Sequence, residues 1–100
     1  MGSASAIAPD LKAECLPVAA KVFWWCTPEE GLQDLTRFVA QVMTFGDWED
    51  VRRTMGILGE KAFEAVLDDP PPGVFDRKSW NYWHLFFRRT SLPPLPRREL

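Results

Sequence analysis

Few side chains of this 100-residue sequence are of the types that perform chemistry, and their spacing assembles no known kind of site. The single histidine, His84, lies among aromatic residues, where a structural or interface role is more typical than catalysis. The two cysteines, Cys15 and Cys26, are too few for a disulfide framework and predict reduced, buried thiols. Neither a phosphate-binding glycine loop nor a zinc-ligand spacing is present. We therefore expect a protein with no catalytic residue, metal ion or cofactor.

The paired acidic residues are explained by helix ends rather than by acid–base catalysis. Thr27-Pro28-Glu29-Glu30 has the form of a capping box, in which the Thr27 hydroxyl and the Glu30 carboxylate each accept from the other residue's amide. Asp68-Asp69 runs directly into three prolines, which marks a helix C-terminus rather than a metal site.

Hydrophobic periodicity predicts an all-α fold, a small bundle of four to five helices, with no strand. The expected elements are a helix broken at Pro17 and reaching about Trp24, a four-turn helix from Thr27 to Gly46, a helix from Asp47 to about Gly56, a helix from about Glu60 to Leu67, and a helix from about Arg77 to Arg89 capped by Asp76. Gly56 and Gly59 either bracket a turn or lie in a continuous, kinked helix. We expect residues 1–9 to form a flexible tail, 10–90 one helical domain and 91–100 an extended arm.

The expected buried faces follow from helical spacing. The inward residues are Leu32, Leu35, Phe38, Val39, Val42 and Met43 in the second helix, Trp48, Val51 and Met55 in the third, and Phe63, Val66 and Leu67 in the fourth.

The last helix is apolar on more than one side. One stripe at i, i+3, i+7 contains Trp80, Trp83 and Phe87, and the residues off that stripe are Tyr82, Leu85 and Phe86. A small domain rarely buries a helix completely, so we predict one core face and one face for a partner. Alternatively, the aromatic run at 23–25 folds over the second face.

Charge is divided along the chain. Residues 1–76 carry 6 basic and 13 acidic side chains, and residues 77–100 carry 6 basic and 1 acidic, so the two parts have net charges of −7 and +5. The basic residues are Arg77, Lys78, Arg88, Arg89, Arg97 and Arg98. This basic end either lies against the protein's own acidic body or meets an acidic partner or a phosphate backbone.

The chain ends in a proline-rich segment, Leu92–Arg98, which suits polyproline II geometry and matches the proline-rich ligands of SH3 domains. We expect an arm that is extended along a partner or disordered. No apolar run approaches the roughly 20 residues that a membrane span needs, and no basic leader precedes the domain. These features favour a cytoplasmic protein.

Two short helices across 48–67 have the length of a helix-turn-helix. The second contains two glutamates and one lysine, which would repel phosphate, and it offers no Arg, Asn or Gln to base edges. The overall pI of about 5.3 also disfavours a dedicated nucleic-acid binder.

Three aromatic motifs together resemble a family of small bacterial helical proteins. They are Phe23-Trp24-Trp25, the turn Phe45-Gly46-Asp47-Trp48-Glu49-Asp50, and the Trp80–Trp83 helix, and the resemblance spans roughly residues 23–87. Here Phe45 stands where the family pattern has tyrosine. The family's genes often lie beside nucleotidyltransferase-fold toxins of the AbiEii or MenT-like type. The resemblance implies an antitoxin, and it implies no catalytic residues.

The sequence thus predicts a non-catalytic protein-binding module, the antitoxin of a type II toxin–antitoxin pair. The expected partner is a nucleotidyltransferase-fold toxin, whose apolar groove would receive the aromatic helix while the arginines meet its metal-binding carboxylates. The expected partner-binding residues are Trp80, Tyr82, Trp83, Phe86, Phe87, Arg88, Arg89, Arg97 and Arg98. The alternatives are a nucleic-acid-binding transcriptional regulator that uses the basic helix and arm, and a homodimer paired through the aromatic face.

Overall fold

Six α-helices account for all regular secondary structure in residues 9–89 and 92–95, the part of the chain that the computed structural model describes. They are α1 (Pro9–Val22), α2 (Pro28–Gly31), α3 (Leu35–Phe45), α4 (Trp48–Leu58), α5 (Glu60–Asp68) and α6 (Arg77–Phe86). The predicted all-α class is confirmed. One more helix is present than expected, because the predicted Thr27–Gly46 helix is divided into α2 and α3.

The local signals for helix starts are confirmed. At Thr27 the hydroxyl accepts from the amide of Glu30, and the Thr27 amide donates to the Glu30 carboxylate at 3.0 Å. A second capping box joins Asp47 and Asp50, with both reciprocal amide–carboxylate bonds formed. Asp76 accepts from the amide of Ser79 at 2.7 Å. Each of these bonds satisfies an amide that the first helical turn leaves without a partner.

The predicted helix is interrupted after Gly31, the last residue of α2. Gly31 is buried against the ring of Phe23 so closely that a Cβ atom would lie 2.2 Å from it. The chain then turns, and Asp34 begins α3 by accepting from the amide of Arg37 at 3.1 Å.

One prediction for a helix interior is wrong, and one alternative that the sequence left open is decided. Helix α1 continues through Pro17 to Val22 without a break, because the lost backbone bond is offset by the buried side chains on its inner face, Cys15, Val18, Ala19 and Val22. Helix α4 continues through Gly56 to Leu58, as in the continuous-helix alternative, and the turn occurs only at Gly59, whose φ is 90°.

The last helix ends three residues earlier than expected. Arg88 adopts a left-handed conformation with φ of 55°, which stops α6 at Phe86. The amides of Arg88 and Arg89 then donate back to the carbonyl oxygens of Leu85 and His84, at 3.0 and 2.9 Å. These bonds close the helix end without a glycine.

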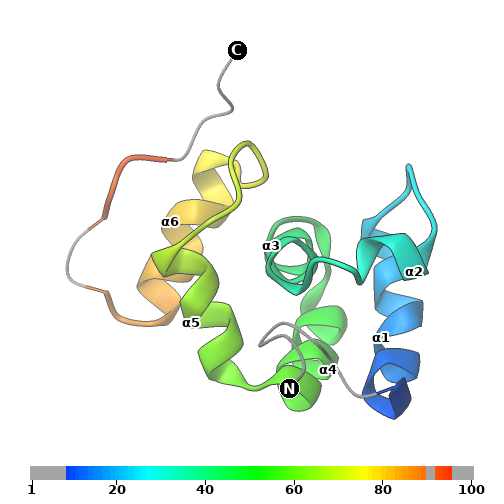
Figure 1. The fold of residues 1–100 in the computed structure, drawn as a ribbon. Coiled ribbons are helices and arrows are strands. Elements are labelled where there is room, and N and C mark those ends of the chain that lie inside the picture. The colour runs from blue at the N-terminus through cyan, green and yellow to red at the C-terminus, as the bar shows by residue number, and fades with distance from the viewer. Residues whose placement is uncertain (1–8, 90–91, 96–100) are drawn as a thin grey trace.

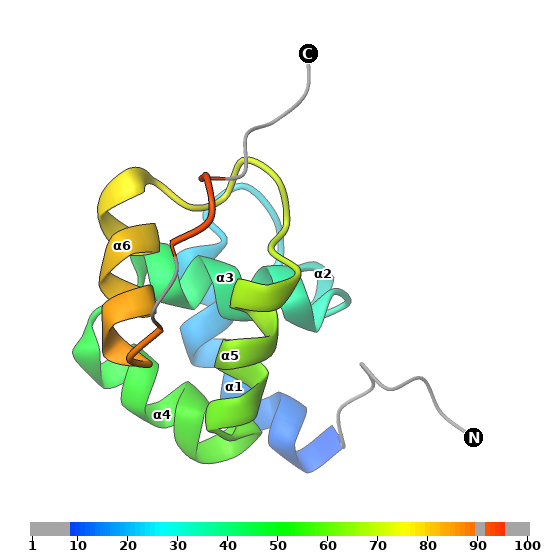
Figure 2. The same cartoon turned by 90° about the vertical axis from the view of Figure 1, so that its left-hand side faces the viewer.

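Helix α3 lies at the centre of the fold, with α1, α4, α5 and α6 packed around it (Figure 1). The view turned by 90° shows α3 crossing behind α5 and α6, with α4 below (Figure 2). Six consecutive α3 residues, from Phe38 to Met43, are buried. A helix that is covered on every side needs this unbroken burial rather than a single apolar stripe.

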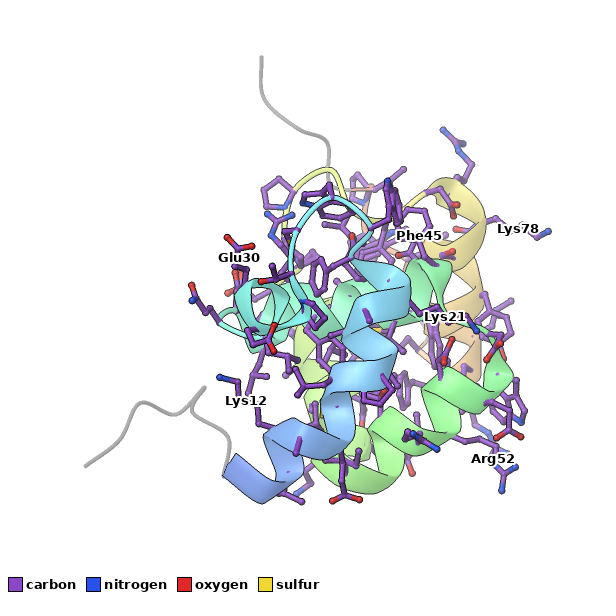
Figure 3. The ribbon with its side chains drawn as sticks, turned by 90° about the vertical axis from the view of Figure 1, so that its right-hand side faces the viewer. Lys12, Lys21, Glu30, Phe45, Arg52 and Lys78 are labelled. Carbon is purple, nitrogen blue, oxygen red and sulfur yellow. The ribbon has the colours of Figure 1, made fainter. Side chains whose placement is uncertain are left out.

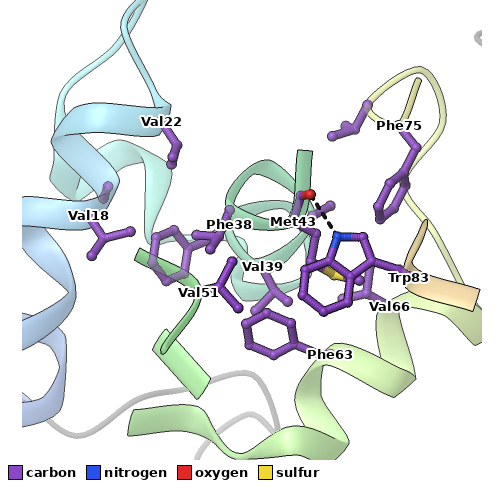
Figure 4. Packing of buried hydrophobic residues seen from close by; sticks show 14 of the residues in the cluster. Val18, Val22, Phe38, Val39, Met43, Val51, Phe63, Val66, Phe75 and Trp83 are labelled. Carbon is purple, nitrogen blue, oxygen red and sulfur yellow. Dashed lines mark hydrogen bonds between the residues drawn. The ribbon is translucent and has the colours of Figure 1, made fainter. Parts of the chain in front are cut away.

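The core gathers side chains from α1, α3, α4, α5 and α6, and Leu32 directly after α2, around Phe38 and Phe63, both fully buried (Figure 4). The buried side-chain amide of Gln41 also has a hydrogen-bond partner, since its Nε2 donates to the carbonyl oxygen of Val22 at 2.8 Å. That carbonyl ends α1 and has no partner within its own helix. Val51, Val66 and Leu67 are buried as predicted. Within the described residues, no helix has the length and apolar character needed to cross a membrane.

Candidate protein-binding surface

Helix α6 presents three different faces. Trp83 points into the core, where its indole N–H donates to the Met43 carbonyl oxygen at 2.8 Å (Figure 4). Trp80 lies on a second side, beneath the C-terminal segment. Tyr82 and Phe86 lie on a third side and are 49% and 37% exposed. Helix α6 thus has the predicted core face and an exposed apolar face, and the binding of a partner by the exposed face stays a prediction.

An open groove of about 400 Å³ runs between α6 and the junction of α3 and α4. We call it the aromatic groove, and its lining residues are Met43, Thr44, Gly46, Asp47, Trp48, Val51, Asp76, Lys78, Ser79, Tyr82 and Trp83. Trp48 is 55% exposed and meets Phe86 edge-on, with 6.4 Å between ring centroids. The groove therefore has large aromatic walls that water reaches.

A second aromatic group is formed by Trp24 and Trp25, which follow α1, and Phe45 at the end of α3. Trp24 packs edge-on against Trp25 and Phe45, with centroid distances of 4.8 and 5.3 Å. All three rings are about half exposed or more. The alternative that the run at 23–25 covers α6 is not what the structure shows: Phe23 enters the core, and Trp24 lies on α3 instead.

A cluster of ion pairs joins the end of α1 to the junction of α3 and α4. Lys21 of α1, labelled in Figure 3, points toward the start of α4. Its Nζ lies 2.5 Å from the Asp47 carboxylate and 3.0 Å from that of Asp50. The hydrogen bond from Lys21 holds the pKa of Asp47 below its ordinary value, and the backbone amide of Asp50 acts in the same direction. The same two carboxylates raise the pKa of Lys21. This ion-pair cluster fixes the α3–α4 junction relative to α1.

Of the basic residues at the C-terminal end, Arg89 faces the protein itself. It donates to Asp68 at 2.6 Å and lies 3.7 Å from Glu64, so it is bound to α5 and only a quarter of its side chain is exposed. The reading in which the basic end lies against the acidic body is thus correct for this residue. Arg88 is exposed and makes no salt bridge within the described residues, whereas Arg97 and Arg98 lie outside them.

The described part of the proline-rich tail does not extend away from the domain. Residues Leu92–Leu95, which we call the strap, run beside α6 (Figure 2). The Trp80 indole N–H donates to the Pro93 carbonyl oxygen at 2.9 Å. Leu95 packs against the core. The expectation of an arm that is free or bound along a partner is corrected for this segment, because α6 supplies both an apolar contact and a hydrogen-bond donor.

Burial also corrects the expectation that Trp80 and Trp83 insert into a partner. Both side chains are 2% exposed, because Trp83 fills the core and Trp80 is covered between Phe75, His84 and the strap. Phe87 is half-buried and stacks on Trp83 at 5.9 Å. Tyr82 and Phe86 are the two predicted aromatic residues that remain on the surface.

The groups considered for chemistry are placed as structural elements. His84 is buried, with Nδ1 2.8 Å from the Trp80 carbonyl oxygen, the geometry of a donated hydrogen bond. Burial and the nearby Glu14 raise the pKa of the Cys15 thiol. Among the residues described, no three His, Cys, Asp or Glu side chains gather as a metal site.

Four surface aromatics were not predicted as site residues: Trp24, Trp25, Phe45 and Trp48. Trp48 was expected to share the inward face of Val51 and Met55. As the first residue of α4, beside an exposed Asp47 cap, it instead points outward. The sequence signal that could have identified this surface is the pair Phe45 and Trp48, which lie on either side of the junction between α3 and α4. Comparison with known protein families, with characterised proteins and with solved structures finds no match to this chain.

Proposed function

We propose that this chain is a non-catalytic protein-binding module that receives its partner in the aromatic groove. The observation that carries this proposal is the exposure of Trp48 and Tyr82 in the lining of one groove, with the exposed ring of Phe86 packed edge-on against Trp48. Exposed aromatic surface of this extent is costly in water, and Trp and Tyr are the side chains that most often dominate protein interfaces.

The resemblance to the small bacterial helical proteins supports a more specific proposal. The partner is a nucleotidyltransferase-fold toxin, and the chain neutralises it in the cytoplasm as the antitoxin of a type II pair. Because Trp80 and Trp83 are buried, the contact falls to Tyr82, Phe86 and Trp48. Because Arg89 is paired with α5, the cationic contact falls to Arg88, with Arg97 and Arg98 of the tail.

The test uses the tagged full-length chain expressed in its native host, with bound proteins identified by mass spectrometry. Recovery of a nucleotidyltransferase-fold protein at near-stoichiometric amount is the expected result. Tyr82→Asp and Phe86→Asp should each weaken that complex by about 30-fold or more, the effect of losing a central interface residue. Leu85→Asp is the matched control, since Leu85 is on the same helix, 76% exposed and outside the groove.

Two results would contradict the proposal. One is equal weakening by all three substitutions in variants that remain folded by circular dichroism. The other is recovery of nuclease-sensitive nucleic acid without a protein partner, with binding that falls steeply as salt is added. The second result would favour the nucleic-acid-binding regulator, and a dimer in light scattering that Tyr82→Asp dissociates would favour self-association.

A further inference from the structure

The face of α6 beneath the strap has the features of a site for an extended, proline-rich peptide. Proline has no N–H to donate, so such peptides are recognised through their carbonyl oxygens and apolar rings, typically by aromatic grooves. Trp80 supplies both kinds of contact. Its ring lies under the strap, and its indole N–H donates to Pro93.

The strap is anchored at two further points. Leu95, two residues after Pro93, inserts against the core. Before the strap, the left-handed turn at Arg88 and the Arg89–Asp68 ion pair direct the chain back toward the domain. The contact is therefore specific in register, with one carbonyl and one leucine fixed relative to α6.

The strap leaves part of this site unfilled. A hollow of about 340 Å³ remains between it and α6, bordered on the helix by Arg77, Trp80 and Asn81. A peptide that occupied this space as well would make more contacts than the strap does. The site lies on a different side of α6 from Tyr82 and Phe86, so it is independent of the aromatic groove.

We infer that this face of α6 is a binding site for a proline-rich segment of another polypeptide, and that the strap occupies it within the same chain. The fitting ligand has the pattern Pro-Pro-Leu, with the first carbonyl on Trp80 and the leucine in the position of Leu95. A tethered segment competes at an effective concentration on the order of millimolar. An external ligand therefore binds only when it exceeds the strap in affinity or when the strap is released.

The experiment uses the full chain and the peptide Ser-Leu-Pro-Pro-Leu-Pro, which carries no side-chain charge and so is not attracted by the acidic body. Binding is followed by the indole N–H resonance of Trp80, assigned with Trp80→Phe. Leu95→Asp releases the strap, and Leu85→Asp is the control, because Leu85 is 76% exposed on α6 and does not line the hollow. A peptide of scrambled order controls for composition.

We expect Leu95→Asp to reach half-saturation at a peptide concentration at least about tenfold lower than the wild type or Leu85→Asp. Wild-type protein at millimolar peptide gives a test without destabilising variants, since its Trp80 resonance should move saturably while those of Trp24 and Trp25 do not. If neither the wild type nor folded Leu95→Asp shows a Trp80 shift that the scrambled peptide lacks, the inference is overturned.

Discussion

The indole N–H of Trp83 donates to the backbone carbonyl oxygen of Met43 at 2.8 Å, and this bond joins two helices across forty positions of the chain. Met43 lies in the last turn of α3, where carbonyl oxygens have no partner within their own helix. The Trp83 side chain thus caps a carbonyl oxygen at the C-terminal end of α3, as the Gln41 side chain caps the Val22 carbonyl oxygen at the end of α1. Both contacts make the helix ends depend on the tertiary fold.

Replacing Trp83 with phenylalanine should lower the free energy of unfolding by about 2–4 kcal/mol. The substitution leaves the buried Met43 carbonyl without its donor and opens space in the core. Urea denaturation followed by circular dichroism measures the change. Trp24→Phe, at a side chain 67% exposed, should alter the stability by less than about 0.5 kcal/mol. Equal effects at the two positions would contradict the buried role of Trp83.

The two glycines at positions 31 and 56 should respond to alanine with opposite signs. Gly31→Ala places a Cβ atom 2.2 Å from the buried Phe23 ring and should destabilise the protein by about 1–3 kcal/mol. Gly56 lies inside α4 with open space around its missing Cβ, so Gly56→Ala should stabilise by about 0.5–1 kcal/mol. Midpoints of thermal unfolding that move in the same direction for both variants would show that this packing is incorrect.

Acid should weaken the contact between α6 and α5. The hydrogen bond from Arg89 holds the pKa of Asp68 below its ordinary value, so the native carboxylate stays ionised to a lower pH than the unfolded one. The resulting stability is present above the unfolded pKa of about 4 and is lost as pH falls through the lower native pKa. Urea unfolding at pH 7 and at successive values below 4 should show a smaller acid loss in Asp68→Asn than in the wild type. Asp69→Asn, beside it but without an ion pair in the described residues, should retain the wild-type profile.

The buried hydroxyl of Thr54 offers a stabilising substitution. Its Oγ1 has no hydrogen-bond partner among the residues that the structure describes, although the side chain is fully buried. Thr54→Val keeps the shape and removes this unpaired group, so it should raise the free energy of unfolding by about 1 kcal/mol. Thr44→Val is the comparison, since the Thr44 hydroxyl donates to the Ala40 carbonyl oxygen at 2.9 Å. Thr44→Val should not raise the free energy of unfolding. If Thr44→Val alone raised it, the stabilisation could not come from removing an unpaired hydroxyl.

The helix starts could be predicted from sequence because their cause is local. The side chains of Thr27, Asp47 and Asp76 bond to amides three residues away, so four neighbouring residue types are sufficient to identify each start. The division after Gly31 was not predicted because Leu32 and Leu35 keep helical spacing across it, although Asp34 is itself a local cap. The predicted break at Pro17 was wrong for a tertiary reason. The cost of a proline inside a helix can be read from the sequence, but the burial of the inner face of α1, which offsets that cost, cannot.

The candidate surface was predictable in part. Helical spacing separates Tyr82 and Phe86 from the core-facing Trp83, and burial follows that division. The same spacing could not reveal that Trp80 is covered by the strap, since that contact joins residues thirteen positions apart through a turn at Arg88. The exposure of Trp48 depends on how α4 meets α6, which residue order alone does not specify.

The reversal at Arg88 also changes the electrostatic shape of the molecule. Along the chain, negative and positive charge are segregated into two blocks, an arrangement that would give an extended polymer a large dipole moment. In the folded domain, the turn returns Arg89 to Asp68 and Glu64, so part of the positive block is neutralised against the negative one. A ligand approaching α6 at long range therefore meets a weaker and more mixed potential than the linear order of charges implies.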